Sequence, residues 1–225
     1  MTENYELYRK KHLFSSIIIA VVLMACPWII ELIEFIANTD FNPWGLQPRK
    51  LSGLTGVVTM PLLHAGINHL FSNTVPLLLF IAGLFYFYPT IAWRVLLWSV
   101  LIAGVWLWVI GIKGSVHVGA SGLVYALAAF HFTGGVIRQN RHLIAFAMLV
   151  IFLYGSMIWA VFPDFYPDKN ISWEGHLTGL IAGVILAFVY RKEGPQPDRH
   201  WKDEEEEEDA YPGWDVFSDG EDDDV

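Results

Sequence analysis

The chain alternates long apolar stretches with short polar connections that carry most of its basic residues. A bilayer core about 30 Å thick requires about 20 predominantly apolar residues in each spanning helix. Six stretches without aspartate, glutamate, lysine or arginine approach that length: Leu13–Ile30, Leu70–Tyr88, Val95–Ile112, Val116–Ile137, Leu143–Phe162 and the shorter Gly175–Tyr190. The pattern predicts an all-α membrane protein with six transmembrane helices.

A seventh apolar run, Gly53–Leu63, is too short to span a bilayer. It contains Gly53, Gly56 and Pro61, which interrupt a regular helix. We therefore expect this run to be a re-entrant or interfacial segment between the first two spans. The sequence divides into an N-terminus over residues 1–12, a six-span domain over 13–192 and a tail over 193–225.

Composition supports a membrane protein. Hydrophobic residues make up 54% of the chain and charged residues only 16%, where soluble domains average about 25% charged residues. The net charge of −9 is concentrated in residues 193–225, which hold 15 of the 23 acidic and 2 of the 14 basic side chains. No basic patch or stripe indicates a nucleic-acid partner. The single cysteine, Cys26, excludes an intramolecular disulfide and a cysteine-cluster metal site.

The basic residues predict the orientation, because cytoplasmic loops are enriched in lysine and arginine. On the six-span arrangement ten of the 14 fall on the side of both termini, and four fall on the other: Arg49, Lys50, Lys113 and Lys169. We expect a multi-pass protein of a bacterial or archaeal cytoplasmic membrane with both termini in the cytoplasm. We expect the first span to remain as an uncleaved anchor, the alternative being a lipoprotein cleavage box ending at Cys26.

Residues 193–225 differ from the rest of the chain because they are strongly acidic. Glu204–Glu208 is an unbroken run of carboxylates, and such runs repel one another and stay disordered. We therefore expect a disordered cytoplasmic tail. Tyr211, Trp214 and Phe217 lie among the acids, so a docking segment for an unknown partner is the alternative.

Polar side chains recur where the second, fourth and sixth spans begin. With both termini inside, these three spans start at the outer face, at or near His69 and Asn73, Ser121 and His176 respectively. Ionisable residues inside a bilayer are costly and are candidates for function. Three segments far apart in the sequence thus place polar groups at one depth near the outer leaflet, which indicates a buried site.

The chemistry of the candidates indicates nucleophilic catalysis. Ser121 lies between Gly119 and Gly122 at the expected start of a helix, where unpaired N–H groups and the helix dipole stabilise developing negative charge. His176 can accept the serine proton as a general base. Ser121 and His176 therefore make a minimal pair of nucleophile and base.

Other residues fit around this pair. His69 and Asn73 are four apart, so on a helix they share a face and can donate to one oxyanion, while His64 belongs to the preceding loop. Tyr125, four residues after Ser121, can pack against the imidazole.

Gly179 and Gly183 form a small-residue stripe that permits close helix packing. No acid is placed to orient His176, since Glu174 is two residues away and would face elsewhere on a helix.

Three further histidines fit structural roles. His117 is expected at a wet rim near Ser121, and His131 and His142 lie toward the opposite end of the fourth span or beyond it. No His-Glu-x-x-His motif or carboxylate cluster indicates a metal site, and no cofactor is expected.

These motifs together resemble those of the rhomboid intramembrane serine proteases of the six-span bacterial type, over roughly residues 13–192. The family pattern of His, four residues, His, three residues and Asn is matched by His64, His69 and Asn73. Its Gly-x-Ser-Gly is matched at residues 119–122, and its histidine followed by glycine in the sixth span is matched by His176 and Gly179. The Trp-Arg pair of the first loop in some members is absent, since Gly45 follows Trp44.

The resemblance implies a Ser121–His176 dyad and an oxyanion hole made by His69, Asn73 and the Ser121 backbone N–H. It also implies that Tyr125 supports His176 and that the first loop is embedded in the membrane. The expected activity is cleavage of the transmembrane segments of single-span proteins, with membrane lipid as the surrounding partner. One alternative is a non-catalytic protein of the same fold that binds transmembrane clients. A third alternative, a small transporter, is weaker because transporter sites lie near the membrane midplane, whereas the polar groups of this chain cluster near one face.

Overall fold

The computed structural model describes residues 2–153 and 172–195, and the regular structure in that part of the chain is helical. Six longer helices are seen in these residues: α1 (Thr2–Ala37), α3 (Ile67–Phe87), α4 (Ala92–Ile110), α5 (Ser121–Ile137), α6 (Arg141–Leu153) and α8 (Trp173–Val189). Between α1 and α3 lie four short helical pieces: η1 (Asn42–Trp44), η2 (Leu51–Thr55), α2 (Gly56–Thr59) and η3 (Met60–Leu62). We refer to residues 38–66 as the first loop.

Three of the described helices are long and apolar enough to cross a membrane: Leu7–Ala37, Ile67–Phe87 and Ala92–Ile110. Helices α5, α6 and α8 are equally apolar but shorter within the described residues. The protein is therefore an integral membrane protein with several spans. The count of six stays a prediction, and the part of the expected fifth span beyond Leu153 lies outside the described residues.

Two predicted spans differ most from the observed helices. The first helix runs over Thr2–Ala37 and passes through Pro27, well beyond the expected Leu13–Ile30, because the apolar run marks the lipid-facing length and not the end of helical hydrogen bonding. The expected span Val116–Ile137 becomes helical only at Ser121. Residues before it are held differently, since His117 N donates to Leu46 O at 2.8 Å and Leu46 N donates to His117 O at 2.9 Å.

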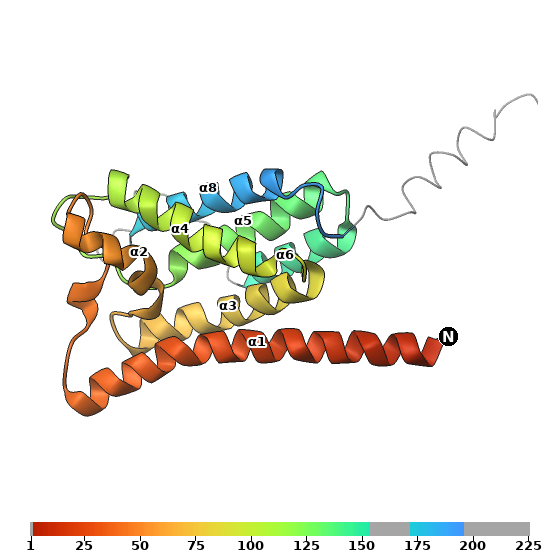
Figure 1. Cartoon of the computed structure of the whole chain (residues 1–225), viewed down its shortest axis with the longest axis horizontal. Helices are drawn as coiled ribbons and strands as arrows, with labels where there is room; N and C mark the ends of the chain where they lie inside the picture. Colours follow the sequence, from red (N-terminus) through yellow and green to blue (C-terminus); the bar gives the residue numbers. More distant parts are fainter. Residues whose placement is uncertain (1, 154–171, 196–225) are drawn as a thin grey trace, which may run out of the picture.

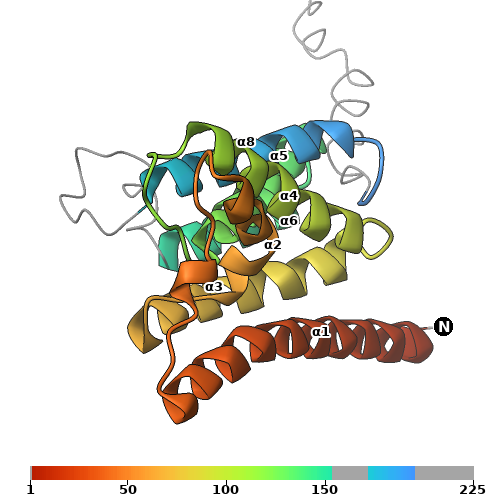
Figure 2. The same ribbon diagram turned by 60° about the vertical axis from the view of Figure 1, so that its left-hand side comes forward.

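Helix α5 lies at the centre of the bundle. It contacts α3, α4, α6 and α8, whereas α1 packs along α3 at the edge, as both views show (Figure 1, Figure 2). The first loop and the N-terminal ends of α3, α5 and α8 lie at one end of the bundle, while the N-terminus of α1 and the C-terminal end of α8 lie at the other. Both described ends of the chain therefore lie on the same side, opposite the first loop.

Helices α5 and α8 approach each other through glycines. A Cβ at Gly179 would collide with the carbonyl oxygen of Gly122, and one at Gly183 would collide with that of Ala126. Helices in a membrane associate through close packing, because lipid gives no hydrophobic driving force between them. The predicted small-residue stripe is thus the surface on which α8 meets α5.

The chain after α8 is fixed to the bundle by buried Arg138, which follows α5. Its Nη1 donates to Gly134 O at 3.1 Å, and its Nη2 donates to Tyr190 O at 2.6 Å and also to Glu193 O. Glu193 also pairs with Arg94, with Oε2 and Nη2 2.7 Å apart. These contacts continue past Lys192, the expected end of the six-span domain.

Substituting Gly183 by leucine should separate α5 from α8. We expect the free energy of unfolding to fall by about 1–3 kcal/mol, because a side chain here meets backbone that cannot move aside. The midpoint of thermal unfolding in detergent measures the effect. Val189→Leu, at an exposed position of the same helix, is the control and should leave the midpoint unchanged. Equal midpoints for both variants would contradict the packing described here.

Truncation of the tail should separate anchoring from the acidic segment. A chain ending at Pro195 keeps the bonds of Arg138 and should unfold at the wild-type midpoint. A chain ending at Arg191 loses the Glu193 carbonyl as an acceptor of Arg138, and we expect a loss of about 1–2 kcal/mol. Thermal unfolding of both truncated proteins tests this, and equal midpoints for the two would contradict it.

Candidate active site

Ser121 is the first residue of α5, and the chain before it adopts a conformation that requires glycine. Gly119 has φ +108°, in the left-handed region that glycine favours, and its N–H donates to Met60 O at 3.0 Å. This turn lets the chain enter α5 directly at Ser121. The first N–H groups of a helix have no partner within the helix, so they surround the Ser121 hydroxyl with donors and a positive dipole end.

His176 lies in the first turns of α8, where Ser172 caps the helix. The Ser172 hydroxyl accepts a hydrogen bond from Gly175 N at 3.1 Å, which fixes the start of the helix. His176 is buried, and its Nε2 lies 3.0 Å from Ser121 Oγ. That distance allows the serine hydroxyl to donate to Nε2 in the tautomer whose proton is on Nδ1, the geometry that a nucleophile and its general base require.

Tyr125 is one turn after Ser121, and its ring stacks on the His176 imidazole. The ring centroids are 4.4 Å apart and the planes are inclined by 23°. The stacking restricts rotation of the imidazole about its χ angles. Tyr125 is therefore packed directly against His176, as the spacing of four residues from Ser121 predicts.

His69, in the first turn of α3, lies against Gly119. A Cβ at Gly119 would stand 2.7 Å from His69 Nε2, so only glycine allows the imidazole to approach the chain this closely. The Nδ1 atom accepts a long hydrogen bond of 3.5 Å from Ala65 N. In this tautomer Nε2 carries the proton and is a donor beside the turn that leads to Ser121.

Asn73 is one turn further along α3 than His69 and is buried. Its Nδ2 donates to His69 O at 3.2 Å, which uses one of the two amide protons. The side chain is thus held on the face of α3 that carries His69. The two residues share a face, as their spacing requires.

His64 lies in the first loop, and its ring meets that of His69 edge to face with centroids 5.1 Å apart. Burial and, to a smaller extent, the neighbouring His69 lower the pKa of His64 to about 4, while a backbone contact at Leu62 opposes the shift. His64 is therefore neutral at physiological pH. Neither of its ring nitrogens has a hydrogen-bond partner within the described residues, so its role there is to pack against His69.

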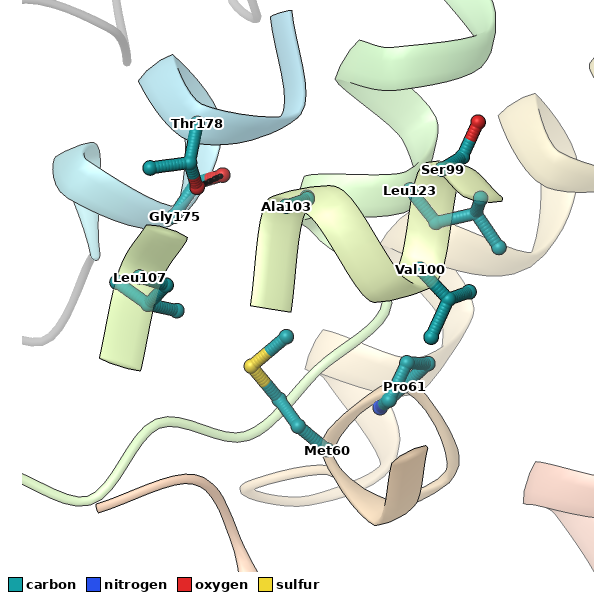
Figure 3. Close-up of a pocket in the computed structure, with 10 residues that line it drawn as sticks. Met60, Pro61, Ser99, Val100, Ala103, Leu107, Leu123, Gly175 and Thr178 are labelled. Carbon is teal, nitrogen blue, oxygen red and sulfur yellow. Dashed lines mark hydrogen bonds between the residues drawn. The ribbon is translucent and has the colours of Figure 1, made fainter. Parts of the chain in front are cut away.

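A small cavity of about 10 Å³ lies beside the dyad, with space for about one water molecule. Its lining comes from the first loop (Met60, Pro61), α4 (Ser99, Val100, Ala103, Leu107), α5 (Gly122, Leu123) and α8 (Gly175, Thr178), most of which Figure 3 labels. Neither Ser121 nor His176 lines it. The cavity is therefore a neighbour of the dyad and not the cleft that receives a reacting group.

Two polar residues near the site differ from what the sequence suggests. Glu174 is only 4% exposed, and its Oε1 has no hydrogen-bond partner within the described residues. Glu174 is buried because it lies in the first turn of α8, which packs against α4 and α5. The wet rim expected at His117 is wrong, because this residue pairs with Leu46 of the first loop. His117 is likewise buried, and burial lowers its pKa while the charge of Glu174 opposes that shift. Spacing alone gives no signal for this proximity.

The remaining histidine candidates lie away from the dyad. His131 is fully buried among aromatic rings, with its Nε2 3.1 Å from Phe80 O, on the half of α5 remote from Ser121. It is a packing residue. Within residues 2–153 and 172–195, no three side chains of the types that ligate metals come together.

Comparison with known proteins agrees with these motifs. The model of the Rhomboid domain matches residues 52–193. An uncharacterised protein of Mycobacterium tuberculosis is 34% identical over 179 residues, covering 75% of this chain and 72% of that protein. An uncharacterised protein of Mycobacterium leprae is 32% identical over 180 residues, covering 75% and 69%.

A Bacillus subtilis protein with the provisional name of rhomboid protease YdcA is 30% identical over 144 residues, which is 59% of this chain and 65% of that protein. The domain match covers more than half of the chain and includes the positions of His64, His69, Asn73, Ser121 and His176. The family resemblance inferred from these residues is thereby confirmed: this chain belongs to the rhomboid family.

Proposed function

We propose that this protein is an intramembrane serine endopeptidase that cleaves transmembrane segments of other membrane proteins. The observation that supports it most directly is the 3.0 Å separation of Ser121 Oγ and His176 Nε2. Membership of the rhomboid family and the apolar helices support the setting, a peptide bond within or beside a lipid-embedded helix.

In the acylation step, Ser121 Oγ attacks the carbonyl carbon of the scissile peptide bond while its proton passes to His176 Nε2. The tetrahedral intermediate collapses, the C–N bond breaks, and the proton on His176 passes to the leaving amine. An ester then joins Ser121 to the N-terminal part of the substrate. Water adds to this ester with His176 as base, and the new carboxyl group leaves with Ser121 restored.

The oxyanion of the tetrahedral intermediate is bound by three donors in this proposal. They are the backbone N–H of Ser121, the Nε2–H of His69 and the remaining amide proton of Asn73. Loss of a single such donor commonly reduces kcat by about 10²–10³-fold. The tautomer of His69, with its Nδ1 accepting from Ala65 N, supports the second donor.

The substrate must expose its backbone to the dyad. An intact helix hides each carbonyl in a hydrogen bond to the residue four positions on, so the substrate has to unwind locally. Weak helix formers such as glycine or proline near the cut favour that step. We propose that both termini are cytoplasmic, which sets the dyad near the outer leaflet of a bacterial or archaeal cytoplasmic membrane.

Cleavage of a single-span reporter by the purified protein in liposomes tests the proposal. Wild type should cut the reporter, and Ser121→Ala should reduce the rate at least 10³-fold, because the nucleophile is lost. Ser16→Ala is the matched control, since Ser16 is a buried serine on α1 whose hydroxyl donates only within its own helix. Its activity should equal that of wild type.

A fluorophosphonate probe supplies a second readout for the same proteins. It should label wild type and Ser16→Ala at Ser121 and should leave Ser121→Ala unlabelled. If several reporters stay intact and Ser121 is unlabelled in a folded wild-type protein, catalysis is wrong and binding of transmembrane clients without cleavage takes its place.

The rate should depend on pH through His176. Only the neutral imidazole accepts the serine proton, so kcat/KM should fall about tenfold per pH unit once His176 is protonated. Titration of His64 does not contribute to this fall in kcat/KM, because its pKa of about 4 keeps it neutral from pH 5 to pH 9. Initial rates measured from about pH 5 to pH 9 give the profile, and a flat profile would argue against His176 as the base.

A further inference from the structure

Three cations gather at the end of the bundle that carries Ser121. Arg49 N donates to Trp108 O at 3.0 Å and Arg49 Nη2 donates to Gly111 O at 2.8 Å, which fixes the first loop to the C-terminal end of α4. Trp108 Nε1 donates in turn to Lys50 O at 2.9 Å. Lys113 follows Gly111 by two residues. The three cations, Arg49, Lys50 and Lys113, form what we call the loop cation patch.

The loop cation patch has no acidic partner. The chain contains no aspartate or glutamate between Asp40 and Asp164, and no ion pair forms at any of the three in the part of the chain that the structure describes. All three side chains are exposed. Lys50 Nζ donates to Gln47 Oε1 at 2.7 Å, a neutral acceptor that leaves the charge uncompensated. Most of the positive charge of the patch is therefore available to an external anion.

Exposed apolar side chains border the patch. Leu51 is 79% exposed, Trp44 69% and Ile112 63%. Lys113 follows α4, which ends at Ile110 and is long and apolar enough to cross the membrane. Cations at the end of a spanning helix lie at the depth of lipid headgroups, where aromatic side chains are also enriched. The apolar border then faces the upper part of the acyl chains.

We propose that the loop cation patch binds the headgroup of an anionic phospholipid in the leaflet on the Ser121 side. Guanidinium and ammonium groups are the side chains that recognise phosphate, and the apolar border supplies contacts that a soluble anion would not use. The acidic tail of the same chain is not the occupant. The tail follows the C-terminal end of α8, which lies at the opposite end of the bundle, so its carboxylates would have to cross the bilayer.

A bound headgroup would hold the first loop at a fixed depth. This loop carries Met60, whose carbonyl accepts from Gly119 N, and Leu46, which pairs with His117. Both contacts support the turn that leads to Ser121. The inference concerns binding and does not depend on the proposed catalysis.

Photocrosslinking in nanodiscs tests the site in the full-length chain carrying Ser121→Ala. The nanodiscs contain phosphatidylcholine and a small fraction of phosphatidylglycerol with a photoreactive group near the glycerol backbone. Mass spectrometry should find the label in residues 44–54 and 108–116. Lys50→Gln with Lys113→Gln should reduce it about 25-fold, since each lysine near an anionic surface contributes about fivefold in affinity.

Matched variants separate charge from structure. Lys50→Arg with Lys113→Arg keeps the charge and should keep the label, and Lys10→Gln with Lys11→Gln removes two exposed cations at the other end and should also keep it. The single variant Lys113→Gln should lose about fivefold, and its side chain makes no hydrogen bond within the described residues, so it tests the patch without disturbing the fold.

Four results would overturn the proposal. The first is an unchanged label in the double glutamine variant when its unfolding midpoint equals that of wild type. The second is equal labelling by a photoreactive phosphatidylcholine. Competition by inorganic phosphate as strong as that by unlabelled phosphatidylglycerol would assign the site to a free anion. Competition by a pentaglutamate peptide would assign it to an acidic protein segment.

Discussion

The contact between α5 and α8 determines whether this molecule has a site at all. Ser121 and His176 lie on different helices. Their side chains meet because the two helix backbones approach so closely that only glycine fits between them. Gly122 and Gly179 face each other in this contact, with no room for a Cβ at Gly179 against the Gly122 carbonyl. Small residues allow such approach in a membrane, where van der Waals packing is the main attraction between helices. The 3.0 Å separation of the dyad is a consequence of that packing.

The first loop satisfies a second constraint, the need of irregular backbone for hydrogen-bond partners at membrane depth. Gly119 N donates to Met60 O, His117 and Leu46 exchange two bonds, and Arg49 N donates to the end of α4. Each of these bonds joins the first loop to α4 or to the segment between α4 and α5. The loop therefore closes the end of the bundle around Ser121 through paired backbone groups.

Periodicity and apolar length predicted the helices that carry the site, because lipid selects uncharged stretches of defined length. The same signal could not locate where α5 begins, since Val116 and Ser121 are equally compatible with an apolar run. The beginning depends on the φ of Gly119 and on pairing with Leu46, about 70 residues away in the sequence. The proximity of Ser121 and His176 was predictable from their chemistry and from their places at the starts of two spans. The burial of Glu174 and its proximity to His117 depend on tertiary packing, which no local pattern encodes.

Packing around the His176 imidazole restricts where this side chain can lie. In soluble serine hydrolases a carboxylate orients the histidine and stabilises its protonated form. A charged group deep in the bundle would be costly unless paired. Glu174, the carboxylate nearest in sequence to His176, is buried, and its charge raises the pKa of His117 against the effect of burial. Here Tyr125 stacks on the imidazole at 4.4 Å and α8 is fixed at its start by the Ser172 cap. These two contacts restrict the imidazole without adding a desolvated charge, and the face of the tyrosine ring attracts the imidazole when it carries the proton in the proposed mechanism.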